Sequence, residues 1–198
     1  MLSRSEILTY ISICDKINTI QVLLFLTRRI KMLKFKGNYL STAGIRFALP
    51  ENFYIDIEGM EAINPDGLRL VSPEKDCSIS FVTTEIEYES TVASLMDIFT
   101  DDVLFKDTQI DFLNDNETGY KWHTEPQQTN LNGLGCACIK YETPRSYYYE
   151  IHFNRIKGFD RQLEILLSVS KEFSTDLDTV LNRENIQDFY NSISLDKE

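Results

Sequence analysis

The sequence predicts an α+β protein in which helices pack against an antiparallel sheet. Three observations favour this class: several short runs alternate apolar with polar residues, two regions show helical spacing instead, and the 198-residue length fits one domain. The strand-like runs come in groups rather than alternating one by one with helices, which favours antiparallel pairing. With 42% hydrophobic and 12% aromatic residues, the composition is that of a folded globular protein.

Strand-like alternation begins after Gly44. In "GIRFALPENF", Ile45, Phe47 and Leu49 share one face, and a turn follows at the proline. Two further runs flank a predicted turn at residues 72–76. Four more strand-like runs follow, separated by Asn, Gly, Pro or Asp: "GYKWHTEP", "LGCACIKYE", "SYYYEIHFNRI" and "RQLEILLSVS".

Helical spacing predicts helices in two regions. Within residues 91–99, apolar side chains recur at i, i+3, i+4 and i+7, namely at Val92, Leu95, Met96 and Phe99. The C-terminal region contains Thr175 followed by Asp178, which resembles a capping box at a helix start. Its apolar stripe consists of Ile186, Phe189, Tyr190 and Ile193.

Charge divides the chain into two parts. Residues 1–36 hold seven Lys or Arg and two Asp or Glu, a net of +5, whereas residues 37–198 hold 13 basic and 29 acidic residues, a net of −16. We therefore predict a basic, helical N-terminal extension at 1–36 and a single acidic domain at 37–198. The extension could contact a membrane surface as a basic amphipathic helix. Its longest apolar run, Val22–Leu26, is too short to span a bilayer.

The acidic domain and the cysteines limit the partners and the compartment. A body of this charge repels phosphate backbones, so we expect no nucleic-acid binding and favour a protein partner with a basic surface. The four cysteines show neither disulfide nor zinc spacing: Cys14, Cys77, Cys136 and Cys138. Reduced thiols in a cytoplasmic protein are the simplest interpretation.

The stretch "PRSYYYEIHF", residues 144–153, raises the question of an aromatic binding patch. Alternation puts Tyr147 and Tyr149 on the core face with the apolar residues that follow, and Tyr148 on the other face with Glu150 and His152. A hairpin with an odd-numbered loop would gather the apolar side chains of both strands on one side. We therefore expect that register, because the buried face sets the pairing of a strand.

The same register would place Cys138 opposite His152, so the candidate binding residues are Tyr148, Glu150, His152 and Cys138. A thiol beside an imidazole is the minimum for a nucleophile or for part of a metal site. Small cysteines that fill space under a helix explain the same pattern.

Other motifs for chemistry are weak. Residues 114–125 match part of a calcium-loop spacing, but they begin with Asn and lie between strand-like runs, so we interpret them as a polar hairpin turn. The chain has no P-loop, no dinucleotide-binding fingerprint and no GxSxG sequence. We expect no cofactor, no metal and no enzymatic activity.

The order of elements resembles the PsbP-like superfamily, which includes the photosystem II extrinsic subunit P, a Ran-binding nuclear import factor and bacterial adaptor-type relatives. The segments that carry the likeness are "GIRFALPENFYID", "GLRLVSP", the helix at 91–99, "LNGLGCACIKYE", "EILLSVS" and "NIQDFYNSISL". The resemblance covers about residues 40–195. It implies an α/β/α sandwich that binds other proteins without catalysis, and it supplies no catalytic residues.

The sequence thus favours a non-catalytic protein-binding module, such as an adaptor, a chaperone or an immunity-type partner. The alternative is a small thiol enzyme or metal-binding protein centred on Cys138 and His152. The two differ in whether those side chains converge in an open pocket.

Overall fold

The computed structural model describes residues 34–36, 38–56, 67–85, 121–124, 126–173 and 175–197. The strands in these ranges are β1 (Lys34–Lys36), β2 (Tyr39–Thr42), β3 (Ile45–Ala48), β4 (Tyr54–Ile55), β5 (Leu68–Val71), β6 (Cys77–Glu85), β7 (Lys121–Trp122), β8 (Gln127–Leu131), β9 (Leu134–Glu142), β10 (Ser146–Phe153), β11 (Arg161–Ser170) and β12 (Ser194–Leu195). The helices are a 3-10 turn, η1 (Lys171–Phe173), and the α-helices α6 (Leu177–Leu181) and α7 (Glu184–Ser192).

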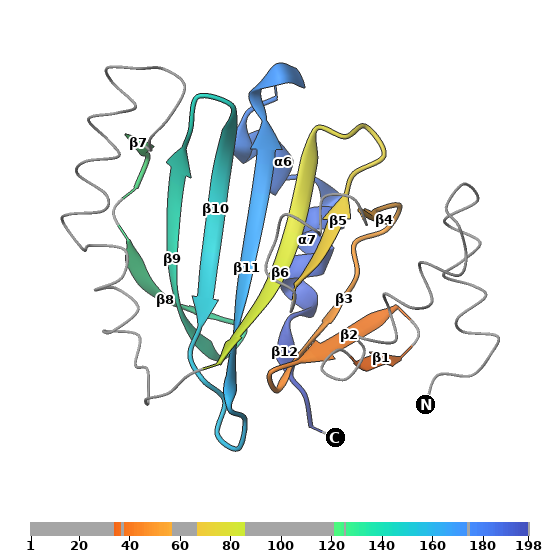
Figure 1. Ribbon diagram of the computed structural model, residues 1–198, viewed down its shortest axis with the longest axis vertical. Helices are drawn as coiled ribbons and strands as arrows, with labels where there is room; N and C mark the ends of the chain where they lie inside the picture. Colours follow the sequence, from red (N-terminus) through yellow and green to blue (C-terminus); the bar gives the residue numbers. More distant parts are fainter. Residues whose placement is uncertain are drawn as a thin grey trace.

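The strands form two antiparallel sheets (Figure 1). The larger sheet has the order β4-β5-β6-β11-β10-β9-β7, and β8 pairs with residues 134–138 of β9 on the same edge. The smaller sheet has the order β1-β2-β3-β12. Both α-helices lie against the same face of the larger sheet, so the predicted α+β class, with helices flanking an antiparallel sheet, is confirmed.

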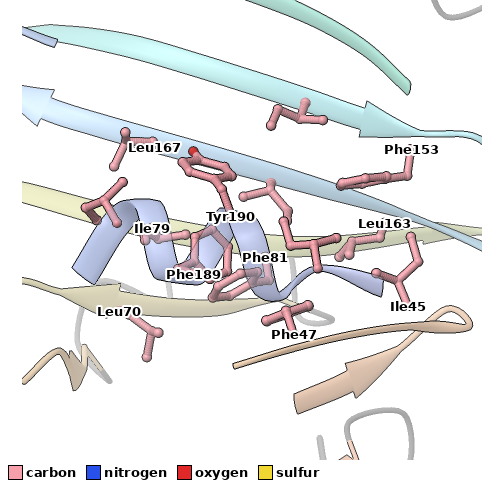
Figure 2. Close-up of a cluster of buried hydrophobic side chains, with 14 of the residues drawn as sticks. Ile45, Phe47, Leu70, Ile79, Phe81, Phe153, Leu163, Leu167, Phe189 and Tyr190 are labelled. Atoms are coloured by element: carbon pink, nitrogen blue, oxygen red, sulfur yellow. The ribbon is translucent and has the colours of Figure 1, made fainter. Parts of the chain in front are cut away.

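The core lies between the larger sheet, the smaller sheet and α7. Along β11 the predicted alternation is confirmed, because its apolar residues are fully buried: Leu163, Ile165, Leu167 and Val169. Phe47 from β3 stacks on Phe81 from β6 at 4.6 Å between ring centroids, and Phe189 from α7 meets both rings edge-on at 5.7 Å (Figure 2). Aromatic contacts of this geometry stabilise a core beyond the area they bury.

The C-terminal helices form as the spacing predicts, although the first helix starts later than expected. Ile186, Phe189 and Tyr190 are buried on α7. The N-cap of α6 is Asp176, not Thr175, because the Asp176 carboxylate accepts hydrogen bonds from both the backbone N and the hydroxyl of Thr179, each at 2.7 Å. Because Asp176 caps the helix through these two hydrogen bonds, the first helical residue is Leu177.

The hairpin of β9 and β10 does not have the expected register. Lys140 pairs with Tyr149 and Cys138 pairs with Ile151, so the pairing is offset by one residue from the odd-loop prediction. The prediction assumed that β9 buries one face only. Ala137 and Ile139 on one face are as buried as Cys136 on the other, so the apolar pattern could not set the register.

Several predictions fall outside the described residues. These are the helix at 91–99, most of the calcium-like segment at 114–125, and residues 1–33 of the N-terminal extension. The last three residues of that extension form β1, which pairs with β2. Among the described residues, neither α-helix has the length and hydropathy needed to cross a bilayer.

Candidate functional site

A polar cluster lies on the face of the larger sheet opposite α6 and α7. As predicted, Glu150 and His152 share this face of β10, and the pairing of β10 with β11 places Glu164 directly across from His152. The His152 Nε2 atom lies 2.6 Å from Glu150 Oε1 and 3.8 Å from Glu164 Oε1. The side chains of Glu150, His152 and Glu164 are only 15%, 12% and 26% exposed, so their mutual contacts replace much of their hydration.

The electrostatics of this cluster favour a shared positive charge. Burial lowers the pKa of His152, but the hydrogen bond to Glu150 and the charges of both carboxylates outweigh it, and the net pKa is raised. Burial raises the pKa of Glu164, and nearby Glu150 adds to this shift while His152 opposes it. The two carboxylates therefore stabilise a cation at the position of the histidine.

Two tyrosines build the wall beside the cluster. The Tyr141 hydroxyl donates to Glu150 Oε2 at 2.9 Å, and its ring stacks on Tyr148 with centroids 4.9 Å apart. Tyr148 was predicted as an exposed binding residue, but it is half-buried in this stack. Tyr141 was missed because the predicted hairpin register was wrong by one residue, and Glu164 was missed because the strand on the other edge of β10 was not predicted.

Cys138 does not join the cluster, and this corrects the predicted pairing with His152. Its partner on β10 is Ile151, so its side chain lies on the helix-facing side of the sheet and His152 lies on the other side. Burial raises the pKa of the Cys138 thiol, and it raises the pKa of neighbouring Cys136 to about 11. Such thiols stay protonated near neutral pH, which argues against a nucleophile activated by His152.

A groove lies between the smaller sheet and α7, with a volume of about 780 Å³. Acidic residues line it on both sides, namely Glu51 from the turn after β3 and Glu184 and Asp188 from α7. All three are exposed, and none forms a salt bridge with another described residue. Arg183 also lines the groove, but its guanidinium group binds the buried Asp76 carboxylate.

The apolar part of the groove comes from Tyr39, Leu49 and Phe189. Tyr39 is 39% exposed, and the Arg46 guanidinium lies 4.1 Å from the centre of its ring. Asn185 Nδ2 donates to the Glu51 backbone oxygen at 3.5 Å, which links the two walls. This groove could not be predicted from the sequence, because its walls are more than a hundred residues apart in the chain.

Comparisons with known proteins found similarity only among solved structures. No known family model and no curated protein matches the chain. The solution structure of cyanobacterial PsbP (CyanoP) from Synechocystis is similar, with a TM-score of 0.50 and 14% identity over 77% of this chain and 87% of that one. The Ran-binding protein Mog1p of Saccharomyces cerevisiae matches with a TM-score of 0.43 and 13% identity, over 77% and 90% of the two chains.

A protein of unknown function from Pseudomonas aeruginosa has a TM-score of 0.37 and 13% identity, over 71% of this chain and 83% of that one. At these identities the similarity concerns the fold alone. The conclusion about the fold rests on the cyanobacterial structure, whose TM-score is 0.50. The chain therefore has the PsbP-like architecture that its sequence resembles.

Proposed function

We propose that the protein is a non-catalytic binding module whose groove between the smaller sheet and α7 takes a basic segment of a partner protein. The observation that carries this proposal is the set of three exposed carboxylates, Glu51, Glu184 and Asp188, that face one groove without a salt-bridge partner among the described residues.

The charges of the groove favour a cationic ligand. Glu184 and Asp188 are four residues apart on one helix, and like charges at this spacing repel one another. Glu51 adds a third negative charge from the opposite wall. A Lys or Arg side chain placed among them would relieve this repulsion, and the net charge of −16 over residues 37–198 would speed the approach of a basic partner.

The size and lining of the groove suit a short segment. Clefts of about 300–1,000 Å³ enclose small ligands or a few side chains rather than a whole folded surface. The groove's 780 Å³ falls in this range. Tyr39 supplies an exposed aromatic ring at the edge, which is the type of residue that contributes most at protein interfaces. The expected ligand therefore combines basic with apolar residues.

The test measures binding of a fluorescent peptide that alternates Lys with Leu, by anisotropy, to the full chain. The groove variant carries Glu51→Gln, Glu184→Gln and Asp188→Asn. We expect it to bind the peptide about tenfold more weakly, because partly exposed charge pairs contribute about 0.2–1 kcal/mol each. Added salt should weaken binding to the unmodified chain and affect the groove variant less.

The matched control removes three exposed carboxylates elsewhere, through Glu74→Gln, Asp160→Asn and Glu172→Gln. It changes the net charge by the same amount, so it reports the general attraction of an acidic protein for a basic peptide. Equal affinities of the groove variant and this control would refute the groove as the binding site. Retained affinity in the control alone would support it.

A further inference from the structure

We propose that Glu150, His152 and Glu164 form a binding site for a divalent first-row metal ion of the zinc type. This site lies on the larger sheet, away from the groove, and it goes beyond the binding function proposed above.

The backbone brings the three side chains to one point. Glu150 and His152 are two residues apart on β10 and therefore share a face, and Glu164 is the cross-strand neighbour of His152 on β11. One potential ligand atom from each side chain lies within 4.8 Å of the other two. Ligand bonds of about 2.0–2.2 Å in tetrahedral geometry separate two ligand atoms by roughly 3.4 Å, so small side-chain rotations would bring these three atoms onto one ion.

The individual distances require little adjustment. The separation of 3.8 Å between His152 Nε2 and Glu164 Oε1 is close to that of two ligands on one metal. The 2.6 Å contact between His152 Nε2 and Glu150 Oε1 is a hydrogen bond, and it would widen slightly by rotation of the glutamate. The same imidazole nitrogen that now meets the carboxylate would then meet the ion.

A supporting hydrogen bond orients one of the ligands. Tyr141 donates to Glu150 Oε2 at 2.9 Å, which leaves Oε1 directed toward His152. The Tyr141 ring is itself held by its stack on Tyr148. Ligands on two paired strands with a tyrosine behind them form a more rigid site than ligands on loops, and such supporting contacts tune metal affinity.

The donor set indicates the kind of metal. One imidazole nitrogen with two carboxylate oxygens suits zinc and similar first-row ions better than calcium or magnesium, which prefer oxygen alone. Two carboxylates also balance a charge of +2. A divalent ion at this position would compensate the burial of the two carboxylates, as a protonated His152 does in its absence.

The test uses the full chain without an affinity tag, refolded with and without the metal. Calorimetry with Zn²⁺ should show one site. Co²⁺ should give weak d–d absorption without the strong thiolate charge-transfer band that cysteine ligands produce. Zn²⁺ should also raise the melting temperature, because an ion that binds only the folded state stabilises it.

Two variants remove ligands and one serves as the matched control. His152→Gln and Glu164→Gln should each weaken Zn²⁺ binding at least about tenfold, in the range known for ligand and supporting-shell changes. His123→Gln removes an imidazole that also contacts a glutamate, with His123 Nε2 3.1 Å from Glu142 Oε2, but on another part of the sheet. It should bind Zn²⁺ as the unmodified chain does.

Circular dichroism without metal checks that each variant folds, and Glu164→Gln is the milder change should His152→Gln fail to fold. Absence of Zn²⁺ binding by the refolded full chain would overturn the proposal. The cluster would then be a protonated His152 between two carboxylates. A thiolate band with cobalt, or unchanged affinity in a folded ligand variant, would overturn it as well.

Discussion

At the scale of single residues, the ion pair of Asp76 and Arg183 links the turn between β5 and β6 to the C-terminal helices. Asp76 lies in the turn between β5 and β6, and its side chain is 5% exposed. It accepts hydrogen bonds from the Ser72 hydroxyl at 2.8 Å and from both terminal nitrogens of Arg183, which lies between α6 and α7. The hydrogen bond from Arg183 holds the pKa of Asp76 below its usual value, although burial opposes the shift.

Asp76→Asn should lower the free energy of unfolding by about 2 kcal/mol near neutral pH, the typical cost of losing a buried hydrogen bond to a charged group. The depressed pKa means that ionised Asp76 stabilises the fold above the unfolded-state pKa of about 3.9, and that this stabilisation is lost as pH falls through the lower, folded-state value. Urea unfolding of both proteins at neutral and acidic pH measures the difference, which should shrink in acid. A difference independent of pH would contradict the ionic role.

Residues of the candidate site could be predicted only where the alternation of side chains along a single strand decides their position. It placed Glu150 and His152 together correctly, because neighbours at i and i+2 share a face in any strand. It could not supply Glu164, which depends on a neighbouring strand, and it misplaced Cys138, which depends on a register. The face on which a residue of a strand lies can be predicted from its neighbours in the sequence. The pairing between strands depends on the packing on both sides of the sheet, which the local sequence does not show.

At the scale of elements, the hairpin of β2 and β3 is one of two described hairpins with a two-residue loop, the other being that of β8 and β9. The loop between β2 and β3 consists of Ala43 and Gly44, with φ of 50° and 76°. Two-residue hairpins of this type require positive φ at both positions, which glycine adopts without strain. Gly44 also lies under an aromatic ring, because a Cβ atom there would stand 2.6 Å from Phe159 Cε2.

Gly44→Ala should destabilise the fold by about 1–2 kcal/mol, because it adds a methyl group at positive φ and against a ring. Gly158→Ala is the matched control, since Gly158 also has positive φ, at 94°, but no atom within 4 Å of a Cβ. The difference between the two variants in chemical denaturation isolates the contact with Phe159. Equal losses would mean that the ring moves aside without cost.

Elements with a clear period were predicted, and the short ones were not. The alternation of β3 and β11, the turn at residues 72–76 and the stripe of α7 all appear in the structure. β12 has only two residues, too few to show any period, so its place beside β3 could not be predicted. The same limit applies to β4, also two residues long, whereas β7 lies within the run "GYKWHTEP" that was predicted as strand-like.

At the scale of the whole molecule, three aromatic rings join the parts into one core. Phe47, Phe81 and Phe189 come from the smaller sheet, the larger sheet and α7, and each is at most 1% exposed. Because these rings contact one another, separation of either sheet or of α7 from the core would expose the rings of the other two elements to water. The described residues should therefore unfold in one cooperative step.

Phe189→Ala should lower the free energy of unfolding by about 3–5 kcal/mol, the usual cost of a large cavity in a core. Phe173→Ala is the matched control, because Phe173 is 46% exposed and its loss should cost no more than about 0.5 kcal/mol. Thermal unfolding followed by both far- and near-ultraviolet circular dichroism measures the two changes. Separate transitions in the Phe189→Ala protein would show that the sheets can unfold independently.

The fold class could be predicted from the sequence. Grouped runs of alternating apolar and polar residues indicate an antiparallel sheet, and the apolar stripe at helical spacing near the C-terminus indicates a helix packed against it. The order of strands could not be predicted, because the position of β11 between β6 and β10 is a matter of packing rather than of period. The acidic groove was not predictable for the same reason.

The pairing of β3 with β12 has a consequence for synthesis on the ribosome. Ser194 and Leu195 of β12 pair with Arg46 and Ile45 of β3. Just before β12, at the end of α7, the Ser192 hydroxyl accepts a hydrogen bond from the backbone N of Ala48 at 2.8 Å, across 144 residues of sequence. The smaller sheet therefore cannot be completed until nearly all of this sequence has been translated. Until then one edge of β3 and the rings of Phe47 and Phe81 lack their C-terminal cover. Nascent chains in this condition are prone to aggregate, so chaperones that hold apolar segments would protect this one until α7 and β12 emerge.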